Sequence, residues 1–237
     1  QVVSAKEHNA YPSVTVHRTV LMLSETSFSN DLLIDVVRTE VKDNPNHTYD
    51  LPYYYYGQLI ETNPVVRKNT DKIEVFGEGA GYQHLWVEGK SEFGKFPSSF
   101  TFLNQNRFYT LSMVSNVNGT VYLNRTGAND PDFNLKNDPS IHFRTKTKDL
   151  LQITLIEPHG NYDPVTEVTL DSYSLVESLN IESDTKDYSA FSFEKKGSDA
   201  SYLIISANQD SDKAMQHTLM INDIAYEWQG PIYVTGN

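Results

Sequence analysis

Short stretches of β-branched and aromatic residues recur along the whole chain, and Gly, Asn, Asp and Pro separate them. Strands that follow one another at a spacing of roughly 8–12 residues, with turn residues between them, are typical of stacked antiparallel sheets. The predicted strands are 14–23, 32–41, 73–76, 84–88, 100–103, 108–114, 121–124, 151–157, 165–170, 175–181, 202–207, 217–221, 224–228 and 232–234.

Several of these stretches alternate between apolar and polar residues. In 188–193, for example, successive side chains change polarity as a half-buried strand requires. Asn222 and Asp223 tolerate positive φ and predict a hairpin turn between two strands. No segment of about 11 residues keeps an apolar stripe at helical spacing. The sequence therefore predicts an all-β fold of stacked antiparallel sheets, resembling a β-sandwich, in one domain over 1–237 with a weak boundary near 145–150.

Composition narrows the class of partner. The chain has 237 residues, no cysteine and a formal net charge of −12, which argues against nucleic acid or an anionic membrane as a general partner. An anionic sugar in a locally basic cleft stays compatible with this charge. No apolar stretch approaches the roughly 20 residues that a membrane helix needs. Residue 1 is Gln within a strand-like segment, so we expect a piece of a longer polypeptide.

Residues 46–58 hold the densest group of candidate side chains, including His47, Tyr49 and Asp50. Histidine and tyrosine transfer protons once their surroundings tune them, and a carboxylate can orient an imidazole. Aromatic residues in strands, however, mostly serve packing. The stretch therefore predicts either a strand of a platform or a surface that faces a substrate.

Residues 81–86 give a second candidate. As a strand, this segment places Tyr82, His84 and Trp86 on one side, where they form either a stacking surface for a sugar ring or an aromatic layer of the core.

Two polar loops complete the candidates. The loop that starts at Arg125 carries Asp130, Asp132 and Asn134 at alternate positions, but it lacks the glycine and the closing glutamate of a calcium loop, so a rigid loop is favoured over a metal site. Glu157 and His159 lie where a predicted strand enters a loop rich in Pro and Gly, a location that functional residues favour.

Seven segments, in this order, resemble the C-terminal region of oligoalginate lyases, which are heparinase II/III-like polysaccharide lyases. Several motifs in one order are more specific than any one of them. The segments are 5–12, 17–19, 47–52, 81–86, 107–110, 127–131 and 157–160.

This resemblance implies a part of a larger enzyme, in which an N-terminal α/α toroid precedes stacked β-sheets. Such enzymes cleave uronic-acid polymers by β-elimination, with catalytic residues mainly in the toroid and a zinc site before the segment that corresponds to residue 1. It implies no catalytic residue, metal ligand or cofactor within this chain. The residues expected to line a uronic-acid oligosaccharide cleft are Glu157, His159, Arg125, His47, Tyr49 and His84.

Two other readings stay open. The 15 tyrosines and the sandwich-like pattern also suit a freestanding carbohydrate-binding or scaffold module. An intact lyase that uses His47 and the tyrosines itself is the third reading. The resemblance implies a periplasmic or secreted bacterial protein that packs on its toroid part, with a homodimer as a further assembly.

Overall fold

The computed structural model describes residues 1–24, 27–42, 46–69, 74–129 and 136–237. The described part is built from antiparallel strands and one 3₁₀ helix, η1 (Tyr82–His84), which confirms the all-β fold. The strands are β1 (Val2–Tyr11), β2 (Val14–Leu23), β3 (Leu32–Val41), β4 (His47–Tyr54), β5 (Gln58–Thr62), β6 (Arg67–Lys68), β7 (Glu74–Val75), β8 (Leu85–Phe93), β9 (Ser98–Asn104), β10 (Arg107–Ser115), β11 (Gly119–Thr126), β12 (Pro139–Thr147), β13 (Leu150–His159), β14 (Asn161–Asp163), β15 (Val168–Leu170), β16 (Val176–Asp184), β17 (Tyr188–Lys195), β18 (Ser201–Ala207), β19 (Gln216–Ile221), β20 (Ile224–Gln229) and β21 (Ile232–Gly236).

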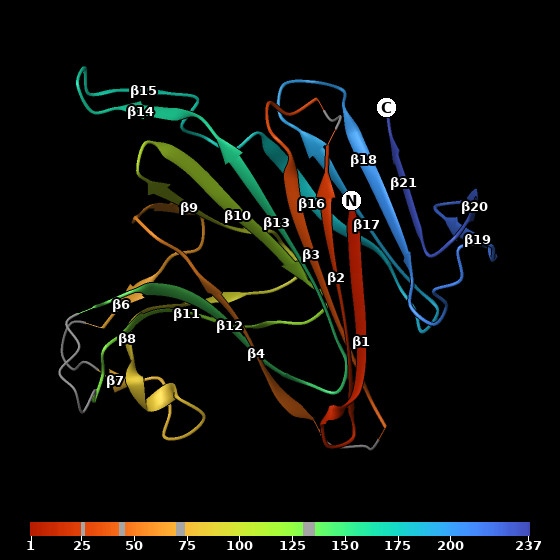
Figure 1. Cartoon of the computed structure of the whole chain (residues 1–237), viewed down its shortest axis with the longest axis horizontal. Helices are drawn as coiled ribbons and strands as arrows, with labels where there is room; N and C mark the ends of the chain where they lie inside the picture. Colours follow the sequence, from red (N-terminus) through yellow and green to blue (C-terminus); the bar gives the residue numbers. More distant parts are fainter. Residues whose placement is uncertain (25–26, 43–45, 70–73, 130–135) are drawn as a thin grey trace.

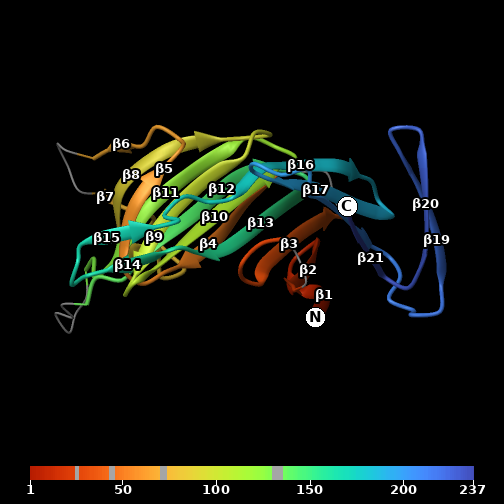
Figure 2. The same cartoon turned by 90° about the horizontal axis from the view of Figure 1, so that it is seen from above.

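Three sheets stack on one another, and two ribbons extend from them (Figures 1 and 2). Sheet I has the strand order β1-β2-β3-β13-β10-β9-β5. Sheet II has the order β4-β12-β11-β8-β6, with β7 also paired to β8, and sheet III has the order β16-β17-β18-β21. The β19–β20 hairpin lies at one end of the stack, beside sheet III, and β14–β15 form a separate ribbon.

Sheet I is the middle layer because its strands bury side chains on both faces. Along β13, alternate residues point to opposite faces, so Leu151, Ile153 and Leu155 pack toward sheet III while Ile156 packs toward sheet II. The core between sheets I and II holds Phe93, Phe100, Leu111, Met113, Val121, Ile141 and Phe143. The core between sheets I and III adds Leu179, Phe191, Phe193 and Ile204 to apolar residues of β2, β3 and β13.

A third apolar cluster joins the hairpin to sheet III. Ala190 and Ile205 of sheet III pack against Ile221 and Trp228 of β19 and β20. Asn222 and Asp223 form the turn of this hairpin with φ of 49° and 65°, which confirms the predicted turn.

The strand pattern of the sequence is largely confirmed. The strands expected at 14–23 and 32–41 are β2 and β3 with the same bounds. The tyrosine-rich stretch 47–54 is β4, and its Leu51 and Tyr53 pack on the I/II core. The stretch 145–150 spans the end of β12 in sheet II and the start of β13 in sheet I.

Two expected strands are wrong at their starts. The strand expected at 165–170 is β15 and begins at Val168, because 165–167 lie in the turn after β14. Tyr82–His84 form a 3₁₀ helix rather than the beginning of a strand, because Gly81, at φ 84°, turns the chain just before it. Tyr82 therefore packs on the outer face of sheet II, against Phe76, whereas Trp86 lies inside β8 on the side of a cleft. The three aromatic side chains do not share one strand face.

Candidate functional site

The six residues expected to line one cleft lie in four separate places. Arg125 lies in a cleft at the edge of sheets I and II, and His47 and Tyr49 border another cavity at the opposite edge. His84 ends the 3₁₀ helix. Glu157 and His159 lie on the face of β13 that points toward sheet III. The fold does not bring these side chains into one site.

Glu157 and His159 are buried and hydrogen-bonded. Glu157 is 2% exposed, and its carboxylate accepts bonds from Ser174 Oγ at 2.5 Å and from the Leu175 amide at 3.1 Å. These bonds tie the segment before β16 to β13, and so tie sheet III to sheet I. His159 is 4% exposed, with Nε2 2.8 Å from Thr110 Oγ1 and Nδ1 2.9 Å from the Asp171 carbonyl oxygen.

Glu157→Gln is expected to lower the free energy of unfolding by about 1–3 kcal/mol, because an amide replaces one acceptor with a donor beside two buried donors. The change is measured by urea unfolding, with Glu177→Gln, at an exposed position of β16, as the matched control. Unchanged stability of Glu157→Gln would contradict the structural role.

The other candidates lie at the surface or on loops. The Tyr49 hydroxyl donates to the Lys148 carbonyl oxygen at 2.9 Å, and the His47 and Tyr49 rings lie 6.4 Å apart. His84 Nδ1 lies 3.0 Å from the Ala128 carbonyl oxygen, which holds the 3₁₀ helix against the loop after β11. Asp130, Asp132 and Asn134 lie outside the described residues.

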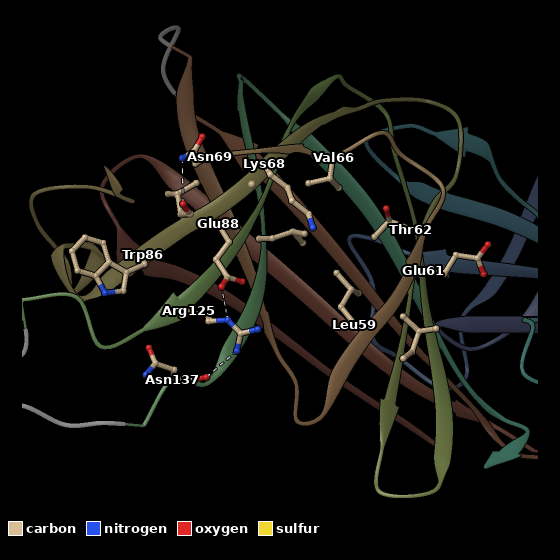
Figure 3. A pocket seen from close by; sticks show the side chains of 14 residues that line it. Leu59, Glu61, Thr62, Val66, Lys68, Asn69, Trp86, Glu88, Arg125 and Asn137 are labelled. Atoms are coloured by element: carbon tan, nitrogen blue, oxygen red, sulfur yellow. Dashed lines mark hydrogen bonds and ion pairs between the residues drawn. The ribbon is translucent and has the colours of Figure 1, made fainter. Parts of the chain in front are cut away.

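A cleft of about 850 Å³ opens where sheets I and II separate at one edge of the stack (Figure 3). β5 forms one wall, and β6 and β8 form the other. Its lining residues are Leu59, Ile60, Glu61, Thr62, Val66, Lys68, Asn69, Trp86, Val87, Glu88, Gly89, Leu123, Arg125 and Asn137.

A β-bulge in β8 sets the geometry of this cleft. Leu123 pairs with Gly89 and Asn124 pairs with Val87, so Glu88 has no partner on β11. The extra residue lets Trp86 pair with Arg125 on the same face as Leu123. Bulges commonly redirect side chains at the edges of sheets and beside binding sites.

Gly89 lets β6 approach β8 closely. A Cβ at this position would lie 2.7 Å from Val66 Cγ1 and 3.2 Å from the Arg67 carbonyl oxygen. Gly89→Ala is therefore expected to displace 65–69 and to destabilise the fold by about 1–3 kcal/mol, the usual effect of overpacking. Thermal unfolding checks this, with Gly79→Ala as the control because a Cβ there meets no atom within 4 Å. Equal midpoints for the two variants would refute the close contact.

The cleft carries charges of both signs. Arg125 Nε donates to Glu88 Oε1 at 2.5 Å, and an Arg125 terminal nitrogen donates to the Asn137 carbonyl oxygen at 3.3 Å. Lys68 is exposed on the wall opposite β5 (Figure 3). Burial raises the pKa of the nearby Tyr55 phenol to about 12, with a lesser rise from Glu88 and an opposing effect of Arg125.

This arrangement suits binding rather than proton transfer. An indole ring, a lysine amine and a guanidinium paired with Glu88 line the cleft, and such groups offer stacking and polar contacts to a ligand. Lys68, Asn69 and Glu88 were not among the residues predicted from the sequence, because only the pairing of β6 with the bulged β8 places them beside Arg125.

Two searches of the described residues gave negative results. No group of three or more His, Asp or Glu side chains there is arranged to hold a metal ion. None of the helical structure described there has the length and apolar character of a membrane span.

Comparison with known proteins relates the chain to alginate lyases, although no protein-family model matches it. It is 30% identical over 235 residues to an exo-oligoalginate lyase of Saccharophagus degradans, covering 97% of this chain and 31% of that protein. It is 28% identical over 231 residues to an alginate lyase of Stenotrophomonas maltophilia, covering 97% of this chain and 30% of that protein. The chain thus spans less than a third of the length of these relatives, and its predicted resemblance to oligoalginate lyases is confirmed over nearly its whole length.

Proposed function

We propose that the chain is the β-sheet portion of a polysaccharide lyase that degrades alginate or alginate oligosaccharides. The observation that carries this proposal is the similarity to two alginate lyases over 97% of the chain. In the proposed reaction a base removes the C5 proton of a uronate, a C4–C5 double bond forms, the C4–O bond breaks and the leaving oxygen takes a proton. We assign none of these steps to residues of this chain.

The role we propose for the chain is to pack on a toroidal catalytic portion of a heparinase II/III-like enzyme and to contact the oligosaccharide. The cleft beside Arg125 is the best candidate contact. Trp86 offers an apolar face to a sugar ring and Lys68 offers a cation to a uronate carboxylate, while Arg125, paired with Glu88, keeps further N–H donors for polar contacts. A zinc site in the remaining portion and a periplasmic or secreted location belong to the same proposal and rest on the resemblance alone.

Lys68→Ala is expected to weaken binding of alginate oligosaccharides by about 5- to 30-fold, the loss of one charge-assisted contact worth about 1–2 kcal/mol. Isothermal titration calorimetry of the purified chain measures the Kd. Lys90→Ala is the matched control, because Lys90 lies on β8 but outside the lining of the cleft. Equal losses in the two variants would point to a general charge effect and contradict the assigned cleft.

The second candidate function is a freestanding carbohydrate-binding module, favoured by the 15 tyrosines of the chain and by the cleft that Trp86 and Lys68 line. Oligosaccharide binding by a chain that never associates with a catalytic portion would support it. Release of unsaturated uronate, followed by its ultraviolet absorbance with the isolated chain, would instead show an intact lyase that uses residues such as His47.

A further inference from the structure

Sheet I extends beyond sheet II at the edge opposite the cleft. β4, the last strand of sheet II, lies over β3 and β13, because the Tyr53 hydroxyl donates to Asp35 Oδ2 at 2.8 Å and also lies 3.0 Å from Thr154 Oγ1. β2 and β1 continue sheet I past this point. Among the described strands, none of sheet II lies beyond β4.

The face of β1 and β2 that points toward the side of sheet II is largely apolar apart from Glu7 and Arg18, and it is exposed along β1 and partly exposed at Val16 and Val20 of β2. The register places Val3 opposite Val20 and Ala5 opposite Arg18, on the same side as Val16 and Met22. Val3 is 73% exposed and Met22 is 43% exposed. We call the set Val3, Ala5, Val16, Val20 and Met22 the β1–β2 face.

The opposite face of the same strands is covered at β2. Leu21 is 3% exposed in the I/III core, and Lys6 of β1 donates at 3.0 Å to the carbonyl oxygen of Asn208, which directly follows β18. At β2 the exposed apolar side chains therefore lie on one side of sheet I, whereas in β1 Val2 and Ser4 are exposed on the other side as well. Contiguous exposed apolar surface of this kind marks an interaction site.

The two charged residues on this side of β1 and β2 differ, because Glu7, opposite Val16, is an exposed carboxylate whereas Arg18 is neutralised by Asp35. Arg18 pairs bidentately with Asp35, with both nitrogen–oxygen distances 2.8 Å. The Asp35 side chain is 5% exposed and that of Arg18 is 55% exposed. The bidentate pair leaves little unmatched charge at Arg18, so the part of the face around Val20 and Met22 suits an apolar partner better than an ion.

A cavity of about 470 Å³ continues this face into the gap beside β4. Its apolar lining includes Val14, Val16, Val37 and Leu150, and Val16 also belongs to the β1–β2 face. The space lies between β2 and the first half of β4. A strand added to sheet II next to β4 would occupy it and cover β2.

The free edges of both sheets lie at this end. β1 pairs with β2 alone and β4 pairs with β12 alone among the described strands. An edge strand presents backbone donors and acceptors to any further strand. Pro52 removes one donor from the second half of β4, so the first half, His47–Leu51, is the better edge for pairing.

We propose that a β-strand from the remainder of a longer polypeptide continues sheet II beyond β4 and covers the β1–β2 face. This inference rests on the proposed function, in which the chain is one portion of a lyase. The relatives supply the length for it, since the chain spans only 31% and 30% of them.

The absence of cysteine allows a clean accessibility test. Single-cysteine variants Val3→Cys and Met22→Cys are prepared in the 237-residue chain and in the full-length polypeptide encoded by its gene. We expect thiol labelling to slow at least tenfold in the full-length polypeptide for both variants. Val165→Cys is the control, since Val165 is 89% exposed in the β14–β15 ribbon, and its rate is expected to stay the same.

Three outcomes would overturn the proposal. The first is an equal labelling rate in the two polypeptides, and the second is a gene that encodes nothing beyond the chain. The third is a labelling rate that falls with rising chain concentration, together with a dimeric mass, which would assign the face to a second copy. The proposed function is tested separately by the Lys68→Ala binding loss. Binding without protection would reject only the docking strand, and protection without binding would reject only the saccharide cleft.

Discussion

Phe143→Ala is expected to lower the free energy of unfolding by about 3–5 kcal/mol, the usual cost of truncating a buried phenylalanine. Phe143 is 1% exposed in the middle of the I/II core. Its ring centroid lies 5.5 Å from that of Phe93, 5.8 Å from that of Phe100 and 5.9 Å from that of Tyr53, so one substitution removes contacts to both sheets. Urea unfolding followed by tryptophan fluorescence and by far-ultraviolet circular dichroism measures the loss.

Phe191→Ala is the matched partner in the I/III core, where Phe191 is fully buried. Because sheet I contributes to both cores, we expect each variant to shift a single transition that both probes report together. Separate transitions, with Phe143→Ala moving one and Phe191→Ala moving the other, would show two independent units and would place a domain boundary inside the stack.

Acid is expected to destabilise the protein through His142. Burial lowers the pKa of this imidazole from 6.5 to about 4, although Asp50 opposes the shift and Arg144 assists it. The unfolded chain therefore binds the proton more readily than the folded protein. The contribution of His142 to the free energy of unfolding is complete above pH 6.5. About 2 kcal/mol of this free energy is lost between pH 7 and pH 5, and the remainder is lost as the pH approaches 4.

The measurement compares the free energy of unfolding at pH 7 and pH 5 in the natural chain and in His142→Phe. A phenyl ring keeps contacts with Tyr54 and Phe76, whose ring centroids lie 5.8 Å and 4.9 Å from that of His142, but it cannot titrate. We expect a smaller pH effect in the variant. The part that persists includes His17, whose pKa burial also lowers. An identical pH effect in both proteins would show that His142 is not responsible.

The strands were predictable from the sequence where their side chains contribute to the apolar cores on both faces of sheet I. β2 and β3 contain long β-branched runs, and their bounds follow from the sequence alone. β12 was missed, although Ile141 and Phe143 alternate toward the core. His142, which points to the outer face of β12, is also buried, because the segment 76–85 covers it. Its polar side chain therefore gives no sign in the sequence that this face is buried.

The candidate site was less predictable because strand pairing separates residues that look alike in sequence. Glu157 and His159 have the polar character and the position near a loop that functional residues often have. The alternation of side chains along β13, however, points both of them toward sheet III. Lys68 lies in a polar segment without any motif. It joins Arg125 only through the two-residue β6 and the bulge at Glu88, a long-range pairing that no local pattern specifies.

The position of β13 has a consequence for the order of folding. β3 (residues 32–41) must wait for β13 (residues 150–159) before its second edge is paired. At a synthesis rate of about 5–20 residues per second, the ribosome needs roughly 5–25 seconds to bridge that separation. During this interval the β2–β3 hairpin presents apolar side chains on both faces, which makes the nascent chain a target for chaperones or for premature association.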